Sequence, residues 1–261
     1  MNIPLLTPEL IEAFIIVFIR VSAMILMVPI FGERRVPFMV TWGLSLLISS
    51  LLFPLVEKQA APAVDLDFLS FALRIGGELA IGVIIGFAAR FIFAGIQVAG
   101  ELIGVQIGFS IANVIDPASN QQVSLITEIQ YMLALLLFLT VDAHHIFIAA
   151  IAESYQAVPP LSFHFSGELL QTLIHLSRDI FIIAIKISAP ITAILLFTNV
   201  GMGVIARTVP QMNIFIVSFP IQIAIGLLFL GLTAPVFVEL AQRFFIGLAG
   251  ETSMLLRLMP S

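Results

Sequence analysis

The sequence predicts an all-α fold: a polytopic helical membrane protein with about six apolar helices, a broken or re-entrant segment and a C-terminal helical hairpin. Of the 261 residues, 60% are hydrophobic and 10% are charged, whereas soluble domains average about 45–50% apolar and about 25% charged residues. Apolar runs long enough for a membrane helix, about 20 residues, recur along the chain. Glycines and prolines interrupt several of them.

Composition also excludes some function classes. The chain has no cysteine, so disulfides, thiolate metal sites and cysteine nucleophiles are excluded. Its net charge of −5 is scattered singly without a basic stripe, so we expect no nucleic acid among its partners. Glu9 and Glu12 stand where a secretory signal would carry basic residues, so the first apolar run is expected to stay as a membrane helix.

The first two apolar runs are short enough for one membrane pass each. Residues 11–31 contain Arg20 and end at Gly32. Residues 39–56 contain Pro54 and precede a polar, proline-containing segment.

The third apolar run is too long for one pass. Residues 79–115 would form about 55 Å of helix at 1.5 Å per residue, against a hydrocarbon core of about 30 Å. The helix either protrudes from the membrane or breaks near Gly95–Gly104. A break is favoured because glycines weaken this region as a helix. Asp116-Pro117 ends the segment, since proline disfavours helix at the preceding residue.

Three further apolar runs follow. Residues 125–151 form the fourth, 179–203 with Pro190 the fifth, and 213–238 with Pro220 and Pro235 the sixth. We expect one membrane domain over residues 1–261, made of N-terminal helices (1–151), a connection (152–178), an autonomous helical hairpin (179–240) and an interfacial tail (241–261).

Charged residues inside apolar runs have two interpretations. They are Arg20, Glu78, Arg90, Glu101, Glu128, Asp142 and Lys186. An ion or proton pathway would use Glu101, Glu128 and Asp142. Pairing with other groups, or a place near helix ends, is favoured because these charges are spread over five segments.

Asp142, His144 and His145 raise the question of a metal or an enzyme. Asp142 and His145 are three residues apart on a helix, but neighbouring histidines point about 100° apart and rarely bind one ion together. The favoured interpretation is a polar cluster at the water interface, with no metal and no cofactor. No nucleophile–base pair, phosphate loop or zinc helix is visible, so we expect a noncatalytic protein; a hydrolase using Asp142 and His145 is the alternative.

The segment from Gly100 to Gln122 is the main functional candidate. Gly100, Gly104 and Gly108 fall on one helical face, where another backbone can approach closely. The following residues are too polar for lipid, yet they include no Lys or Arg. Such backbone is tolerated at membrane depth where it is buried in protein or lines an aqueous cavity. We interpret the segment as the working part of a pore or gate; an ordinary loop is the alternative. The candidate residues are Gln106, Phe109, Ile111, Asn113, Val114, Asp116, Pro117, Asn120, Gln121 and Gln122.

The side chains of this segment suggest two roles. Phe109, Ile111 and Val114 would form an apolar seal. Gln106, Asn113 and Gln121 would hold the segment to its neighbours through hydrogen bonds. Glycine flexibility would allow the seal to move.

Three sequence blocks resemble the FliR family of flagellar biosynthesis proteins. They are residues 18–37, with an aromatic-x-Arg…Pro-x-Phe-Gly pattern, residues 100–122, and residues 199–227. The third block is the most specific and contains Arg207, Pro210, Gln211, Asn213 and Phe215. With length and block order, the resemblance covers nearly the whole chain.

The resemblance implies a noncatalytic subunit of the flagellar type III export gate. Such a subunit lies in the bacterial inner membrane, within the flagellar basal body and in contact with lipid. It closes a helical ring with FliP and FliQ, associates with FlhB and FlhA, and passes exported rod, hook and filament proteins. The segment matching Gln106–Gln122 would plug the pore, and the turn from Arg207 to Phe215 would dock on an adjacent gate protein.

Two other functions stay open at this point. A subunit of an injectisome export gate would share the architecture. A small-solute secondary transporter would show an inverted repeat, and no repeat is visible.

Overall fold

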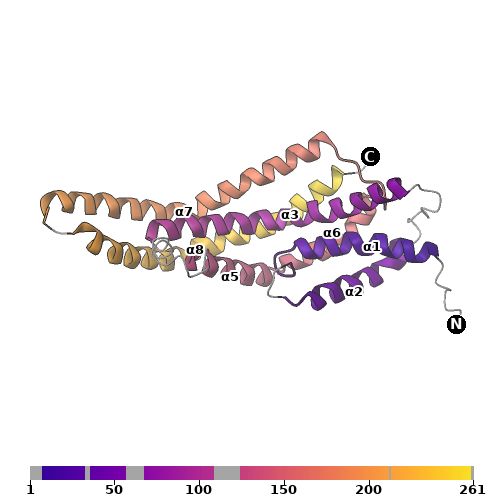
Figure 1. Ribbon diagram of the computed structural model, residues 1–261, viewed down its shortest axis with the longest axis horizontal. Helices are drawn as coiled ribbons and strands as arrows, with labels where there is room; N and C mark the ends of the chain where they lie inside the picture. Colours follow the sequence, from indigo (N-terminus) through magenta and orange to yellow (C-terminus); the bar gives the residue numbers. More distant parts are fainter. Residues whose placement is uncertain (1–7, 33–35, 57–67, 109–123, 212, 260–261) are drawn as a thin grey trace. The chain divides into compact units, whose positions relative to one another are not determined.

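A computed structural model describes residues 8–32, 36–56, 68–108, 124–211 and 213–259. Within these ranges the elements are seven α-helices (Figure 1). In chain order they are α1 (Pro8–Met27), α2 (Phe38–Val56), α3 (Phe68–Ile107), α5 (Leu125–Thr140), α6 (Ala143–Ala157), α7 (Gly167–Thr208) and α8 (Ile214–Arg257). The predicted all-α class is confirmed.

Every predicted apolar run corresponds to a helix or to a pair of helices. Four helices are long and apolar enough to cross a membrane, namely α1, α3, α7 and α8. The pair α5 and α6, bent by 63°, makes a fifth candidate if it counts as one span. α2 is apolar over the shorter stretch Phe38–Pro54. The protein is therefore a polytopic helical membrane protein.

The expected position of the break in the third run is wrong. α3 is one helix of 40 residues that continues through Gly95, Gly100 and Gly104. These glycines lie against neighbouring helices, where a Cβ would collide with Ile183 or Thr127. Tertiary packing of this kind outweighs the poor intrinsic helix propensity of glycine.

The bend lies instead between α5 and α6. It coincides with Asp142, whose φ of 54° is left-handed. Asp and Asn are the non-glycine residues that most readily adopt this conformation. The fourth run is therefore two helices rather than one.

The chain divides into two compact units. Unit 1 consists of Met1–Arg90, Asp142–Leu176 and Ile246–Ser261, and unit 2 of Phe91–Val141 and Ser177–Phe245. The long helices α3, α7 and α8 each contribute to both. The expected single membrane domain, and the subdivision into connection, hairpin and tail, stay predictions.

The core of unit 1 is built on α1. Val17, Val21 and Met24 are fully buried on one face of that helix. A cluster of rings joins α1 to α2, where Phe18 and Trp42 have centroids 5.4 Å apart. Apolar burial of this kind stabilises the unit without any covalent link.

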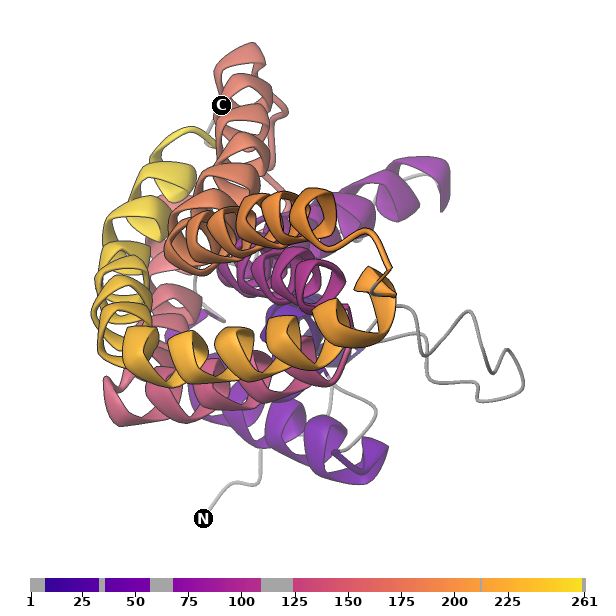
Figure 2. The same cartoon turned by 90° about the vertical axis from the view of Figure 1, so that its left-hand side faces the viewer.

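In unit 2, α3 lies among α5, α7 and α8 (Figure 2). One end of this core is aromatic: the rings of Phe93, Phe138 and Phe245 lie with centroids 5.3–5.6 Å apart. Toward the end of α3 the core becomes aliphatic, with Ile103 and Ile107 fully buried. This aliphatic part supports the functional segment.

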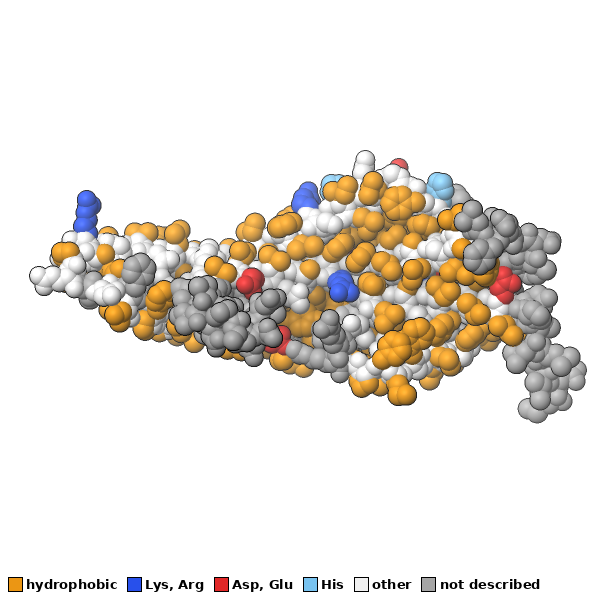
Figure 3. Space-filling model, in the orientation of Figure 1, with side chains coloured by type: hydrophobic (Ala, Val, Ile, Leu, Met, Phe, Trp, Pro, Cys, Tyr) orange, Lys and Arg blue, Asp and Glu red, His pale blue; other side chains and the backbone are white. Residues whose placement is uncertain are grey.

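Hydrophobic side chains also cover much of the face drawn in Figure 3, where charged groups are few and scattered. In the 18-residue apolar window of α8 only 11% of the residues are buried within the chain, and in that of α7 the fraction is 33%. Lipid or other protein subunits must therefore cover most of this surface.

Candidate functional site

The functional candidate begins where α3 ends. Ile107 is its last helical residue, and Gly108 follows with a left-handed φ of 96°. The Gly108 N–H donates to the carbonyl of Val105 at 3.2 Å. A glycine in this conformation is a common helix C-cap, because a Cβ is disfavoured there. The backbone thus turns sharply out of α3 at the start of the predicted pore segment.

Gly104 and Gly100 lie one and two turns before Gly108 and are in close contact with the start of α5. Gly100 and Gly104 are buried. A Cβ on Gly100 would lie 2.6 Å from the Cα of Thr127, and one on Gly104 would collide with the Ser124 hydroxyl. These positions admit only glycine without a shift of α5.

Ser124 is the first described residue after the candidate segment. It immediately precedes α5 and lies against Gly104. The two ends of the segment, Gly108 and Ser124, are therefore both held on the same few turns of α3 and α5. Phe109 to Gln122 lie outside the described residues, and with them nine of the ten candidate pore residues; Gln106 is described and half-buried.

α8 forms the other side of this anchorage. A Cβ on Gly226 would lie 2.5 Å from Ile107, and one on Gly108 would lie 3.2 Å from the ring of Phe219. Ile107 belongs to a buried aliphatic cluster with Ile126 and Leu195. The C-terminal end of α3 is thus fixed by α5, α7 and α8 together.

Buried polar groups lie beside the packed glycines. The Thr127 hydroxyl donates to the Glu101 carboxylate at 3.2 Å. Gln130 is 4% exposed, and its Oε1 has no hydrogen-bond partner among the described residues; neither has the buried Ser124 Oγ. A buried acceptor without a partner costs about 1–3 kcal/mol. Each is therefore a candidate contact for a further polar group.

A second polar group lies nearby on the hairpin. The Gln222 amide on α8 donates to Asn199 Oδ1 on α7 and to Ser218 Oγ at 3.2 Å. Its Oε1 would be 3.9 Å from a Cβ on Gly108. Sequence reasoning did not single out these residues. They could have been found from sequence, because amide side chains inside the apolar fifth and sixth runs need hydrogen-bond partners in a membrane.

The predicted docking residues lie at the α7–α8 turn. Arg207 is in the last turn of α7, and Pro210, Gln211 and Asn213 are exposed between the helices. The side chain of Phe215 is outside the described set. No described side chain packs over the turn residues that are exposed, so a partner can reach them.

The intramembrane charges include one fully buried pair in unit 1. Arg20 of α1 contacts Glu78 of α3 through two hydrogen bonds, Nε–Oε2 at 2.6 Å and Nη2–Oε1 at 3.1 Å. Its Nη1 donates to the carbonyls of Ser154 and Val158, both at 3.0 Å. The pairing interpretation therefore holds for these two charges.

The residues of the alternative proton pathway do not all belong to one unit. Glu101 is exposed at the Thr127 contact, and Glu128 is half-buried in the first turn of α5. Asp142 belongs to the other unit.

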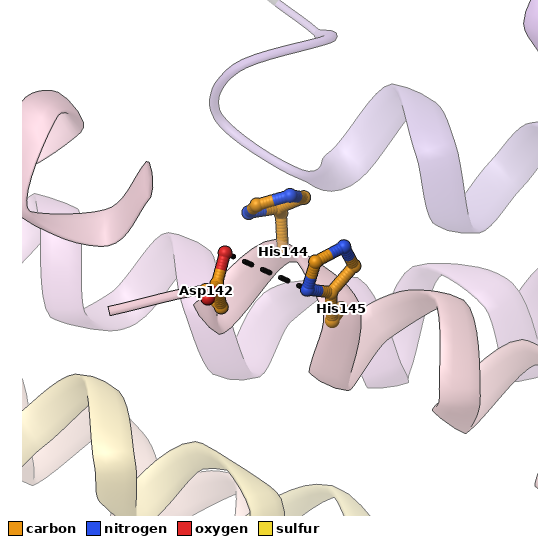
Figure 4. Close-up of side chains that lie close together, drawn as sticks. All are labelled: Asp142, His144 and His145. Atoms are coloured by element: carbon orange, nitrogen blue, oxygen red, sulfur yellow. Dashed lines mark ion pairs between the residues drawn. The ribbon is translucent and has the colours of Figure 1, made fainter. Parts of the chain in front are cut away.

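Asp142, His144 and His145 lie closer together than expected (Figure 4). The two imidazole rings have centroids 4.1 Å apart, and one ligand atom of each residue lies within 4.8 Å of the others. The two rings are tilted by 38° to one another, and the expectation that the two histidines do not share an ion stays a prediction. Asp142 and His145 are mostly exposed, as in a polar cluster at a helix start, and the absence of a metal stays a prediction.

Comparisons with known proteins identify a single family. Residues 11–248 match the family described as bacterial export proteins, family 1. A flagellar biosynthetic protein FliR of Bacillus subtilis is 37% identical over 225 residues, covering 85% of this chain and 86% of its own length. The FliR of Pectobacterium carotovorum is 32% identical over 87% of this chain and 86% of its own. That of Escherichia coli is 30% identical over the same shares.

Proposed function

The chain belongs to the FliR family of bacterial export proteins, and we propose that it closes the flagellar type III export gate, with residues 106–122 as the pore plug. It is a noncatalytic membrane protein of the flagellar export apparatus. The observation behind the plug is the anchorage of both ends of the segment. Gly108 ends α3 beside Phe219 of α8, and Ser124 lies against Gly104 one turn earlier in α3, so both ends of the segment are fixed near the end of α3.

The base of the segment combines a fixed helix end with a glycine at its edge. Packed glycines and buried isoleucines fix the end of α3, whereas the left-handed Gly108 marks the point where the backbone departs. A rigid base with a glycine at its edge suits a segment that must return to one closed position after displacement. Phe109, Ile111 and Val114 form the apolar seal in this proposal, and Gln106, Asn113 and Gln121 bond to the surrounding subunits.

The proposed partners are FliP and FliQ in the ring, FlhB and FlhA beside it, and exported flagellar proteins as cargo. The site of the complex is the inner membrane at the flagellar basal body. The exposed apolar surface of α7 and α8 supports a ring contact, since little of either helix is covered by the chain itself. Asn199 and Gln222 form an amide pair on these two helices. Polar side chains are costly against lipid, so this pair also favours contact with other protein subunits.

Deletion of Ile111–Asn120 tests the plug. The closed gate should then conduct ions, because Ile111 and Val114 of the seal are removed while Gly108 and Ser124 keep their places. Membrane potential and ion leakage are measured in cells or vesicles carrying the gate. Copurification of the other subunits with the deleted chain is the control for assembly. A gate that still assembles and stays tightly sealed would refute the plug.

Docking of the hairpin turn is tested separately. Arg207→Ala combined with Gln211→Ala should weaken copurification of the adjacent gate protein, because both side chains are exposed and free to reach a partner. Arg178→Ala, an exposed arginine elsewhere on α7, is the matched control and should leave copurification unchanged. Intact copurification and normal export in the double variant would contradict docking at this turn.

A further inference from the structure

Unit 1 contains a cavity to which the proposed function assigns no role. It has a volume of about 170 Å³ and lies between α1, α2 and α6. Its walls include Ile25 and Val28 of α1, Leu44 and Ile48 of α2, and Phe147 and Ile151 of α6. Ile25, Val28, Phe147 and Ile151 are almost completely buried. Much of the cavity wall is therefore formed by the core of the unit.

The size and lining indicate an apolar ligand. An engineered cavity of about 150 Å³ lined by Leu, Ile and Phe stays dry and binds benzene. The cavity here is slightly larger and similarly lined. Ile148 contributes to the wall and is 47% exposed, so the cavity has an accessible side.

One polar group interrupts the apolar lining. His144 of α6 is among the lining residues, and its Nδ1 is buried and has no hydrogen-bond partner among the described residues. His144 stands in the first turn of α6 beside Asp142 and His145 (Figure 4). A buried nitrogen left unpaired in an apolar wall costs free energy, so a ligand that supplies a partner gains affinity.

Water is a poor partner for this nitrogen. A buried water needs two to four polar contacts, and the rest of the described lining is apolar. A charged ligand group is also disfavoured, because the cavity could not solvate it. A hydroxyl group is suitable with either imidazole tautomer, since it can both donate and accept a hydrogen bond.

We propose that this cavity binds a small neutral molecule with an apolar body about the size of a six-membered ring and one hydroxyl group, paired with His144 Nδ1. The apolar body fills the space between α1, α2 and α6. The hydroxyl group gives the site its selectivity.

Equilibrium dialysis with two probes tests the proposal. Phenol and benzene share the ring and differ in the hydroxyl. The full chain, with its copurifying gate subunits, is placed in lipid nanodiscs, and uptake by empty nanodiscs is subtracted. We expect saturable binding of both, with phenol about fivefold tighter through one hydrogen bond. Absence of saturable binding above the empty discs, or equal affinity for the two probes, would overturn the proposal.

Two variants assign the binding to this cavity. Ile148→Phe narrows the accessible side and should weaken phenol binding about tenfold. Leu136→Phe, at an exposed position of α5 that does not line the cavity, is the matched control. His144→Phe keeps a ring but removes the nitrogen, so phenol and benzene should then bind equally. Undiminished phenol binding in Ile148→Phe, or an unchanged preference for phenol in His144→Phe, would place the site elsewhere.

Discussion

At the scale of single residues, the Arg20–Glu78 pair shows how a charge can be placed inside an apolar unit. Both side chains are fully buried. The Glu78 carboxylate also accepts the Leu161 N–H at 2.7 Å, and the guanidinium lies 4.3 Å over the Tyr155 ring. The hydrogen bonds around both charges compensate their removal from water. The pair joins α1, α3, α6 and the segment after α6.

Removing one partner should therefore be costly. We expect Glu78→Ala to destabilise the folded chain by about 3–5 kcal/mol, because Arg20 is left buried without its counter-charge. Arg243→Ala breaks an exposed pair with Glu239 and should cost about 0.3–0.5 kcal/mol. Unfolding in detergent–denaturant titrations measures both. Similar small losses for the two variants would show that the buried pair is not a structural requirement.

The packed glycines give a second prediction at this scale. Gly104→Ala should destabilise unit 2 by about 1–3 kcal/mol, since its Cβ collides with Ser124 and shifts the start of α5. Gly231→Ala meets open space and should be neutral or stabilising by up to about 1 kcal/mol, as alanine is the better helix former. The same titration compares them. Equal effects would mean that close packing at Gly104 is unimportant.

At the residue scale, the sequence allowed a correct prediction where the cost of placing a charge in lipid alone decides the outcome. Arg20 and Glu78 had to face protein or water, whatever the fold. Their pairing with each other could not be foreseen, because 58 positions separate them and only tertiary structure brings them together. The close approach of the His144 and His145 rings was missed as well, since it depends on side-chain conformations that sequence does not show.

At the scale of helices, the bend does not lie at the glycines of the third run. α3 is continuous through the glycines that suggested a break, because neighbouring helices pack onto them. The bend of 63° lies at a stretch without glycine or proline. A left-handed aspartate has no clear sequence signature, so this bend could not be located from sequence.

The conformation of Asp142 can be tested by substitution. Asp142→Val should destabilise the α5–α6 junction by about 1–2 kcal/mol, the cost of left-handed backbone for an ordinary L-residue. Asp142→Gly also removes the contact with His145 but suits the backbone, so it should remain near the parent stability. Thermal unfolding of the two variants compares them. If valine and glycine behave alike, the backbone at position 142 is not strained.

At the scale of the whole molecule, the sequence predicted class and element order well. Composition requires a membrane environment, and each of the six apolar runs corresponds to a helix or a bent pair. The ends of α7 and α8 were less predictable, since both extend beyond the expected hairpin of residues 179–240. Helices in contact with protein rather than lipid alone are not limited to the bilayer thickness.

Family membership was predictable because short blocks of unusual residues were conspicuous in an otherwise apolar chain. The glycines and amides between Gly100 and Gln122 required protein or an aqueous cavity around them. Sequence could not show that both ends of this segment are fixed at a single base. That arrangement depends on α3, α5 and α8 packing together at Gly108 and Ser124.

Photocross-linking from Val114 in the assembled gate tests the central proposal most directly. A photoreactive residue at this position should form covalent adducts with at least two other gate subunits, because a plug on the pore axis is surrounded by them. The same variant produced without its partners should give none. Adducts confined to the chain itself or to lipid, in a gate that assembles normally, would contradict the plug.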